Sequence, residues 1–448
     1  MADVTRMRTP AETGISEVFE KLKGSLPGDL STREAALKGF TEVGLPHRRV
    51  EEFKYTDLRA ALRQAAPFAD RPDLAAARRS VEGRTAFRGL DLPRLAMIDG
   101  HLFPELSALD RLPEGVEVVP LRDALAQGHP LLDQLSPVAW ARVNPLYQLN
   151  SAFMADGAVI RVAAGAQVEL PLHLCSVTTA AEGVARATRV LVVVEAGASF
   201  TLIESHESQD GAEHQPNDVV EAVVGDGAIL RHVRLNGEGR DAVALSTLSA
   251  RLGAEARLDA LNVVVGAGTS RHQVFLGFAG EHARANVNGV TMLRGKQHAD
   301  TTLLVDHAVP HGESRELFKT AIDDEATGVF QGKIIVQPHA QKTDGRMMSA
   351  CLLLSEGGTM NNKPELEIFA DDVQCAHGAT CGQLDDDLLF YLMARGLPRP
   401  EAENLMVQAF LGEAVELVEH EQAREALVGV VETWLRARAG RPIPAAQV

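Results

Sequence analysis

The pattern of apolar and polar residues divides the chain into three regions. Up to about residue 135 the pattern is mainly helical, and in its second half short apolar runs such as 95–98 alternate with proline and glycine breaks. Ser31 and Glu34 have the spacing of a helix capping box, and Gly44 ends the helix that follows. We therefore expect a mainly helical N-terminal domain over residues 1–135.

The middle of the chain, residues 136–384, is rich in short β-type runs. Each run opens near glycine or alanine, and in the first half the runs start roughly 30 residues apart. No amphipathic segment of helix length separates them, which argues against alternating β-α-β units. The pattern suits a β-solenoid or a large sandwich, and its persistence over more than 200 residues favours the solenoid. The clearest runs are 166–174, 198–203, 228–235, 256–265 and 365–370.

The helical period returns at the C-terminal end, which predicts a third, helical domain over residues 385–448. Arg395 and Gly396 end its first helix, and Pro400 suits the first turn of the second. The second helix is expected to carry an apolar stripe of Leu405, Met406, Ala409, Phe410, Ala414, Leu417 and Val418. This hairpin either packs on the solenoid of its own chain or docks a partner protein, and both interpretations stay open. The residues expected to contact a partner are Arg395, Gly396, Leu405 and Phe410.

Composition limits the location and the partners of the chain. Forty-four basic and sixty-one acidic residues give a net charge of -17 without a local Lys/Arg cluster, so nucleic acid and anionic membranes are poor partners. No apolar stretch approaches the roughly 18 residues of a membrane span, and no signal peptide is recognisable, so we expect a cytoplasmic protein. The cysteines are too few for a disulfide framework and are expected to be free thiols: Cys175, Cys351, Cys375 and Cys381.

Familiar catalytic motifs do not occur. Residues 328–333 resemble a phosphate-binding loop, but Ile334 stands where a magnesium-binding hydroxyl is needed and the glycine spacing is one residue short. His420 and Glu421 do not continue into a zinc-protease motif, because Arg424 takes the place of the second histidine. We expect a chain that is not an enzyme and does not hydrolyse ATP itself.

The densest cluster of reactive side chains lies at residues 371–377, with Cys381 shortly after. On a strand, Cys375 and His377 project to the same face, so both can bind one soft metal ion. Two ligands leave a tetrahedral site incomplete, and the remainder would come from this chain or from a second protein. The alternative is that Cys375 is a small buried hydrophobic residue and His377 an ordinary surface histidine.

Other polar side chains are interpreted as structural. Asp371 and Asp372 are expected in a turn or cap, because adjacent strand residues point to opposite faces and cannot act together as an acid/base pair. The remaining histidines of interest fit no metal-binding spacing and are taken as scattered: His298, His307, His311 and His339.

Residues 361–380 closely resemble the signature of the SufB and SufD family of iron-sulfur cluster assembly scaffold proteins. Residues 340–344, 389–396 and 51–56 are also similar to that family, so the resemblance extends from Glu51 to about Val418. SufB-type members carry Glu-His-Glu-Ala-Thr where this chain has Ala-His-Gly-Ala-Thr at 376–380, and many have an N-terminal cysteine cluster that is missing here. The resemblance is therefore to SufD-type members, with a SufB-type subunit as the alternative.

The resemblance implies a right-handed parallel β-helix core between a helical N-terminal domain and a helical C-terminal domain that binds the ATPase SufC. It also implies pairing with SufB through the β-helices, or a homodimer when the chain is isolated. His377, and with less support Cys375, would be metal ligands at the SufB interface for transient iron or a nascent cluster, with no tightly bound cofactor. A different class, a β-solenoid carbohydrate-active enzyme, would need aromatic platforms that a chain with 4% aromatic residues supplies poorly.

Overall fold

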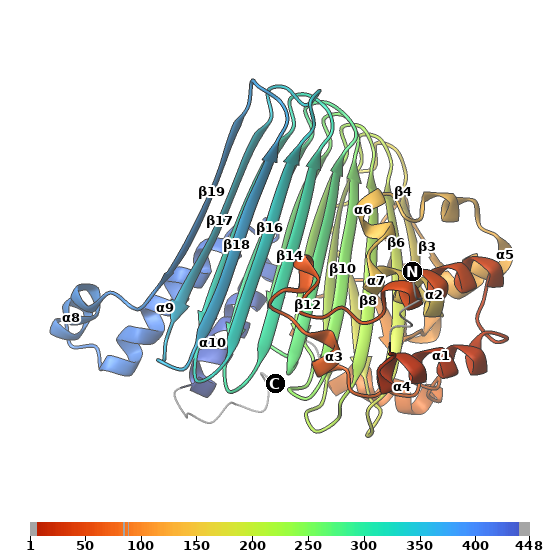
Figure 1. Cartoon of the computed structure of the whole chain (residues 1–448), viewed down its shortest axis with the longest axis horizontal. Helices are drawn as coiled ribbons and strands as arrows, with labels where there is room; N and C mark the ends of the chain where they lie inside the picture. The colour runs from red at the N-terminus through yellow and green to blue at the C-terminus, as the bar shows by residue number, and fades with distance from the viewer. Residues whose placement is uncertain (1–6, 84–85, 88, 439–448) are drawn as a thin grey trace.

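Two parallel sheets form the body of the molecule, whose computed structural model describes residues 7–83, 86–87 and 89–438. From β4 to β19, consecutive strands alternate between a nine-stranded sheet A and a ten-stranded sheet B, so that each pair of strands makes one coil of a solenoid (Figure 1). The predicted mainly β fold, a parallel β-solenoid with helical regions before and after it, is confirmed.

Within each sheet, a strand pairs with the strands of the preceding and the following coil. Sheet A consists of β3 (Val116–Pro120), β4 (Asp156–Val162), β6 (Ala185–Val194), β8 (Gln215–Val224), β10 (Val243–Leu252), β12 (Thr269–Phe278), β14 (His298–His307), β16 (Thr327–Val336) and β18 (Thr359–Ile368). Sheet B consists of β2 (His101–Leu102), β1 (Arg94–Ile98), β5 (Leu172–Thr178), β7 (Ser199–Ser208), β9 (Ile229–Gly237), β11 (Arg257–Val264), β13 (Arg284–Leu293), β15 (Glu313–Ile322), β17 (Asp344–Leu353) and β19 (Gln374–Gly382). Only β2 and β3, at the beginning of each sheet, pair antiparallel.

Helices lie before and after the solenoid. The preceding α-helices are α1 (Pro10–Leu22), α2 (Leu30–Val43), α3 (Leu58–Ala61), α4 (Leu74–Gly83), α5 (Leu121–Gln127), α6 (Ala139–Arg142) and α7 (Pro145–Phe153). Short 3-10 turns are η1 (Glu51–Phe53), η2 (Pro104–Leu106), η3 (Leu109–Arg111) and η4 (Pro130–Gln134). The C-terminal helices are α8 (Asp386–Ala394), α9 (Arg399–Val415) and α10 (Glu421–Arg438). None of the helices in the described ranges has the length and apolar character needed to cross a bilayer.

The turns before β7, β9, β11, β13, β15 and β17 of sheet B explain the glycine- and alanine-led runs of the sequence. Two residues ahead of the strand the backbone has a positive φ, which glycine adopts without strain at Gly197 and Gly227 (69° and 65°). In later coils the same position is held by Glu255, His282, His311 and Lys342. The next residue is small and buried in successive coils: Ala198, Ala228, Ala256 and Ala283.

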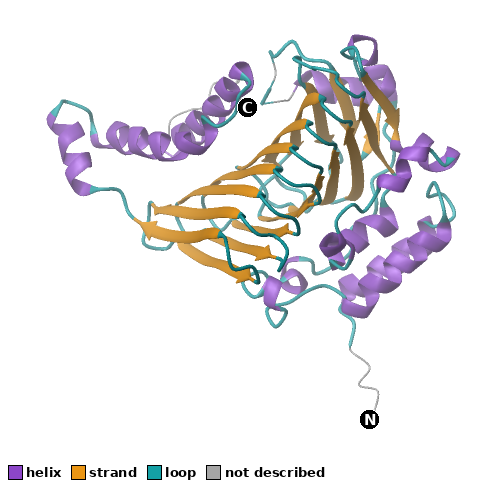
Figure 2. Ribbon diagram, turned by 90° about the horizontal axis from the view of Figure 1, so that it is seen from above, coloured by secondary structure: helices purple, strands orange, loops and turns teal. Residues whose placement is uncertain are grey.

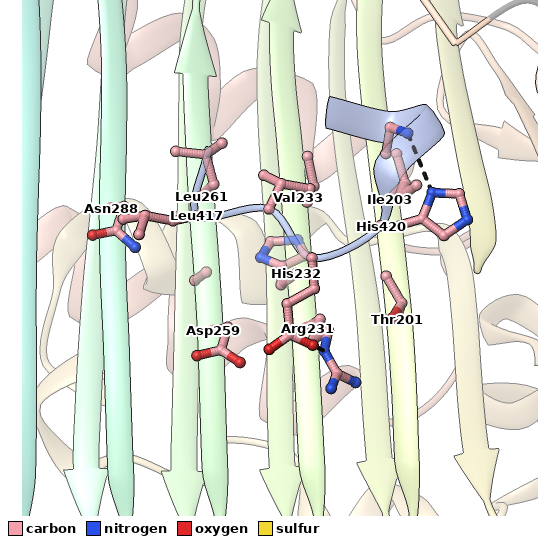
Figure 3. Close-up of a pocket in the computed structure, with 14 residues that line it drawn as sticks. Thr201, Ile203, Arg231, His232, Val233, Asp259, Leu261, Asn288, Leu417 and His420 are labelled. Carbon is pink, nitrogen blue, oxygen red and sulfur yellow. Dashed lines mark hydrogen bonds and ion pairs between the residues drawn. The ribbon is translucent and has the colours of Figure 1, made fainter. Parts of the chain in front are cut away.

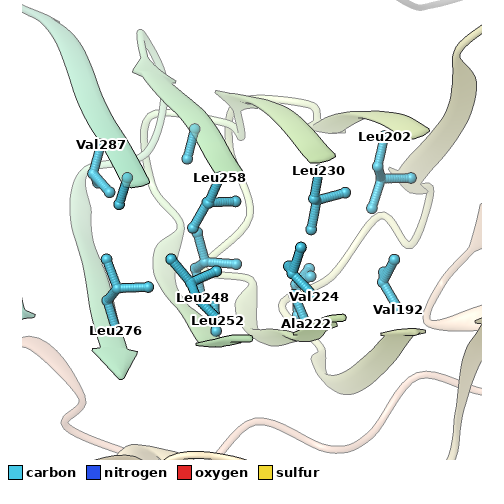
Figure 4. Packing of buried hydrophobic residues seen from close by; sticks show 14 of the residues in the cluster. Val192, Leu202, Ala222, Val224, Leu230, Leu248, Leu252, Leu258, Leu276 and Val287 are labelled. Atoms are coloured by element: carbon cyan, nitrogen blue, oxygen red, sulfur yellow. The ribbon is translucent and has the colours of Figure 1, made fainter. Parts of the chain in front are cut away.

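The interior of the solenoid is built from columns of apolar side chains in register. Val192 of β6 pairs with Ala222 of β8, and Leu230 of β9 pairs with Leu258 of β11. Side chains from the two sheets meet across the interior and form one continuous cluster (Figure 4). Since burying apolar surface contributes about 25 cal/mol per Å², this cluster is the main source of stability in the core.

The outer face of sheet A is covered by the N-terminal helices, and the 51–56 segment is fixed there by a buried ion pair. Arg271 and Asp300 form a salt bridge whose side chains are fully buried. The guanidinium of Arg271 lies 3.8 Å from the ring centroid of Phe53 and donates to a backbone carbonyl of the segment at 2.7 Å. Thr56 donates its hydroxyl to Asp300. These contacts give the 51–56 segment a structural role, which is to anchor the N-terminal region on sheet A.

The outer face of sheet B is covered by α9 and α10, which lie on the opposite side from the N-terminal helices (Figure 2). The apolar stripe predicted for α9 is wrong in part, because Leu405 and Leu417 are exposed. The side of α9 that faces sheet B and α10 is formed instead by Ala402, Val407, Leu411, Ala414 and Val415. Apolar residues lie on more than one side of α9, so helical spacing alone did not identify the packed side.

The capping box predicted from Ser31 and Glu34, for the helix that ends at Gly44, is also wrong. Asp29, two residues earlier, is the N-cap of α2 and accepts from the backbone N–H groups of Ser31 and Thr32. A capping box does begin α1, where Thr9 and Glu12 each accept from the other's backbone N–H. The predicted stop at Gly44 is confirmed as the C-cap of α2.

Replacing Asp300 by Ala should destabilise the folded chain by about 3–5 kcal/mol, because it leaves the buried guanidinium of Arg271 without its counter-charge. Glu325 and Lys296 form an exposed ion pair, so Glu325→Ala should cost less than about 1 kcal/mol. Urea unfolding of the full chain measures both. Equal effects of the two substitutions would contradict the anchoring role of the buried pair.

Candidate functional site

Cys375 and His377 lie on β19, the last strand of sheet B. They pair in register with Gly345 and Met347 of β17, and no strand pairs with the other edge of β19 among the described residues. Because they are two residues apart on one strand, they project to the same face. The structure therefore places both side chains on the last coil of the solenoid, whose outer edge is free.

The two side chains differ in burial. Cys375 is half-buried against the apolar core of the solenoid, and this burial raises the pKa of its thiol. His377 is exposed. An exposed imidazole is available to a metal ion or to a second protein. The half-buried thiol could act as a ligand or could simply pack against the apolar core. Metal binding by either residue stays a prediction.

The other candidate residues do not gather around this pair. His298 contacts Thr56 at 2.9 Å, and His307 contacts the Ser314 hydroxyl at 3.0 Å in the interior. His311 stacks on His282 with ring centroids 4.5 Å apart. Over residues 7–83, 86–87 and 89–438, no set of three or more His, Cys, Asp or Glu side chains is placed to hold a metal ion.

Asp372 belongs to the turn that leads into β19. Its carboxylate forms an ion pair with Lys342, and its backbone carbonyl accepts from the Lys342 N–H in the turn of the preceding coil. Its own N–H donates to the Gln341 side chain at 2.9 Å. Asp372 thus joins successive turns, as the interpretation of a turn carboxylate predicts.

Glu316 is a buried carboxyl that the sequence did not indicate. It lies on β15, pairs in register with Met347 of β17, and is therefore two strands inside the position of His377. Neither carboxyl oxygen has a hydrogen-bond partner. Burial raises the pKa of this carboxyl to about 8, so it is largely protonated at neutral pH. From the sequence alone, Glu316 cannot be told apart from an exposed polar residue of a strand with alternating polar and apolar positions.

Three cavities found among the described residues are small. One of about 30 Å³ lies between the outer face of sheet B and the link from α9 to α10 (Figure 3), and two others measure about 50 and 10 Å³. In the first, Arg231 and Glu419 are paired at 2.6 Å, and the His420 ring accepts from the backbone N–H of Ala423. Pockets for small-molecule ligands measure about 300–1,000 Å³. These cavities admit water rather than a sugar.

The C-terminal helices leave one apolar surface uncovered. Here α8 is exposed along most of its length, with Phe390 74% exposed, and Leu405 of the neighbouring α9 is exposed as well. The exposed apolar side chains are Leu388, Phe390, Tyr391, Met393 and Leu405, and we call this set the α8 surface.

The residues expected to contact a partner lie on or beside the α8 surface. Arg395 is the C-cap of α8, and Gly396 follows with a φ of 93°. Leu405 belongs to the surface, whereas Phe410 is half-buried beneath the ammonium group of Lys319. Contact with a partner stays a prediction for all four.

Two family models match almost the whole chain. Residues 24–174 match the SufBD protein N-terminal region, and residues 177–410 match the SufBD core domain of SUF-system FeS cluster assembly. An iron-sulfur cluster assembly SufBD family protein of Synechocystis is 32% identical over 408 residues, which are 87% of each chain. The iron-sulfur cluster assembly protein SufD of Escherichia coli is 29% identical over 91% of this chain and 92% of its own, and SufD of Bacillus subtilis is 26% identical over 64% and 66%.

The buried Glu316 carboxyl should make folding weaken as the pH rises. The pKa of this carboxyl is raised in the folded chain. Its contribution to the free energy of unfolding is therefore fully present below pH 4.5 and is lost as the pH rises towards about 8. Glu316→Gln should therefore match the wild type near pH 4.5 and be more stable at pH 8, by up to about 1.4 kcal/mol for each pH unit of this window. Urea unfolding at both pH values measures the difference, and identical pH slopes in the two proteins would contradict it.

Proposed function

Because this chain belongs to the SufBD family of SUF-system iron-sulfur cluster assembly proteins, we propose that it works as the SufD-type subunit of a complex with SufB and the ATPase SufC. Family membership makes it a scaffold component of cluster assembly. The similarity to proteins named SufD extends over nearly the full length of the chain. A SufB-type role is less well supported, because Ala376 and Gly378 flank His377 and no cysteine precedes Cys175.

SufB would pair with the open end of the solenoid. The terminal strands β18 and β19 have free edges, and their residues are mostly exposed or half-buried, in contrast to the buried strands before them. A free strand edge offers unpaired N–H and C=O groups to another chain. The isolated chain would use the same edge to form a homodimer.

His377 would supply one ligand to iron or to a nascent cluster at this interface. The observation that carries the proposal is that the exposed imidazole lies on the last coil, beside the half-buried Cys375. A neutral imidazole and a thiolate are both competent ligands for iron, and the missing ligands would come from SufB. The iron and sulfide are cargo, and the chain keeps no resident cofactor.

SufC would bind the α8 surface. Several large exposed apolar residues on one helix are typical of protein interaction sites, and α8 lies at the same end of the molecule as the open coil (Figure 1). ATP hydrolysis would remain with SufC, and its motion would reach the SufB interface through α8. This chain would then be a non-catalytic cytoplasmic subunit. The rival carbohydrate-active enzyme is not supported, since none of the three cavities has the volume of a sugar site.

Replacing His377 by Ala should lower the iron and acid-labile sulfide of the reconstituted complex by more than half, because one ligand is lost while the strand edge is unchanged. Association with SufB, measured by size-exclusion chromatography, should persist. His339→Ala is a matched control, since His339 is exposed in the turn before β17. Cys375→Ser should act in the same way only if its thiol faces the interface. Full cluster content in the His377→Ala complex would remove the proposed ligand.

Replacing Phe390 by Asp should abolish capture of SufC without unfolding the chain, because the side chain is exposed. A substitution is preferable to truncation at residue 385, which would also remove α9 and α10 and uncover sheet B. Val143→Asp is the control, since Val143 is 67% exposed and is the C-cap of α6, which lies at the other end of the solenoid from α8 (Figure 1). Undiminished SufC binding by a folded Phe390→Asp chain would place the contact elsewhere.

A further inference from the structure

The 51–56 segment is fixed on the outer face of sheet A at one end. Thr56 donates to Asp300 of β14, and the backbone carbonyl of Glu52 accepts from Arg271 of β12 at 2.7 Å. The side chains of Thr56, Asp300 and Arg271 are all buried. This end of the segment is therefore held firmly against two inner strands of the sheet.

The other end of the segment reaches the last strand of the same sheet. The Glu52 carbonyl also accepts from the Gln331 side chain of β16 at 3.0 Å, and Glu51 forms an ion pair with Lys363 of β18. Gln331 and Lys363 are partners in register on these neighbouring strands. The segment thus contacts β12, β14, β16 and β18, a span of roughly 14 Å at about 4.8 Å per strand (Figure 1).

Lys363 lies on a strand that has only one neighbour. Among the described strands, β18 pairs with β16 alone and leaves its other edge free. The side chain of Lys363 is 19% exposed and that of Glu51 is 66% exposed, so their ion pair lies at the surface beside this edge. An exposed pair contributes little to the free energy of unfolding of a whole chain. Its effect is instead local, because a strand with one neighbour has few other contacts that fix its conformation.

The order of β18 bears directly on pairing with another chain. A strand loses conformational freedom when a second chain pairs with its edge, and a strand that is already held in its bound conformation loses less. The 51–56 segment holds β18 through a side chain on the outer face of the sheet. The backbone N–H and C=O groups of the free edge stay available to a partner.

We propose that the 51–56 segment positions the edge strand β18 for the partner chain, with Glu51 and Lys363 as its positioning residues. The inference rests on the proposed function in one respect, which is that SufB pairs with this edge. The buried contacts of Thr56 keep the segment rigid, and the ion pair between Glu51 and Lys363 extends this rigidity to β18. Neither residue of the ion pair has to touch the partner or a metal ion.

Hydrogen exchange of the isolated full-length chain tests the positioning role without a partner. In Lys363→Ala the amides of β18 should exchange about fivefold faster or more, whereas those of the inner strand β12 should keep their rates. Lys363→Arg, which retains a cation for Glu51, should keep the wild-type rates in β18. Lys296→Ala is the control, since it removes an exposed ion pair elsewhere on the solenoid and should leave β18 unchanged.

Titration of SufB into the same variants tests the consequence for binding. Lys363→Ala should weaken association by about fivefold or more with little change in Tm, and Lys363→Arg should retain the wild-type affinity. Thr56→Val releases the segment at its buried end, two strands away from β18, and should also weaken association. A lysine that only touched SufB would not make binding depend on Thr56.

Wild-type exchange rates of β18 in Lys363→Ala would overturn the inference. Weaker association of Lys363→Ala but not of a folded Thr56→Val chain would overturn it too, by making Lys363 a direct contact. If SufB binds the wild type and all the variants equally, the positioning role alone fails. If SufB does not bind the wild-type chain on size-exclusion chromatography, the proposed pairing fails and this inference fails with it.

Discussion

Parallel hydrogen bonding in register between successive coils is the constraint on which the rest of this molecule depends. It places Leu258 directly over Leu230 and Cys381 directly beside Cys351, although each pair is separated by roughly 30 residues of chain. The apolar columns of the interior are one result of this constraint. The flat outer faces that receive the N-terminal helices and α9 with α10 are another. A side chain's neighbours are therefore decided by its position within the coil.

What the sequence could predict follows from this regularity. The alternation of strands and the small residue ahead of several successive strands of sheet B, such as Ala198 and Ala228, are local signals, so the solenoid was recognisable. The shared face of Cys375 and His377 follows from the two-residue period of any strand. The exact register between coils is not a local property. The sequence therefore did not show that Cys351 and Cys381 are partners, or that Glu316 lies two strands inside His377.

Helix faces and helix ends were predicted less well, because they are decided by competition between nearby groups. Asp29 is the cap of α2 where Ser31 was expected, since its carboxylate reaches two backbone N–H groups at once. On α9 apolar residues occupy several sides, and contact with sheet B and α10 selects the side of Val407 and Leu411 and leaves Leu405 in solvent. The exposed Leu405 thereby adds to the α8 surface.

The two ends of the solenoid are unlike each other, and this bears on how an assembly through strand edges would grow. At the beginning of the sheets, the terminal strands are the antiparallel β2 and β3, of two and five residues. At the other end, β18 and β19 are parallel strands of ten and nine residues whose outer edges no described strand covers. Under the proposed pairing, two molecules joined by these long edges would present only short antiparallel strands outward. A solenoid with long open edges at both ends would instead add subunits without limit and form a fibre.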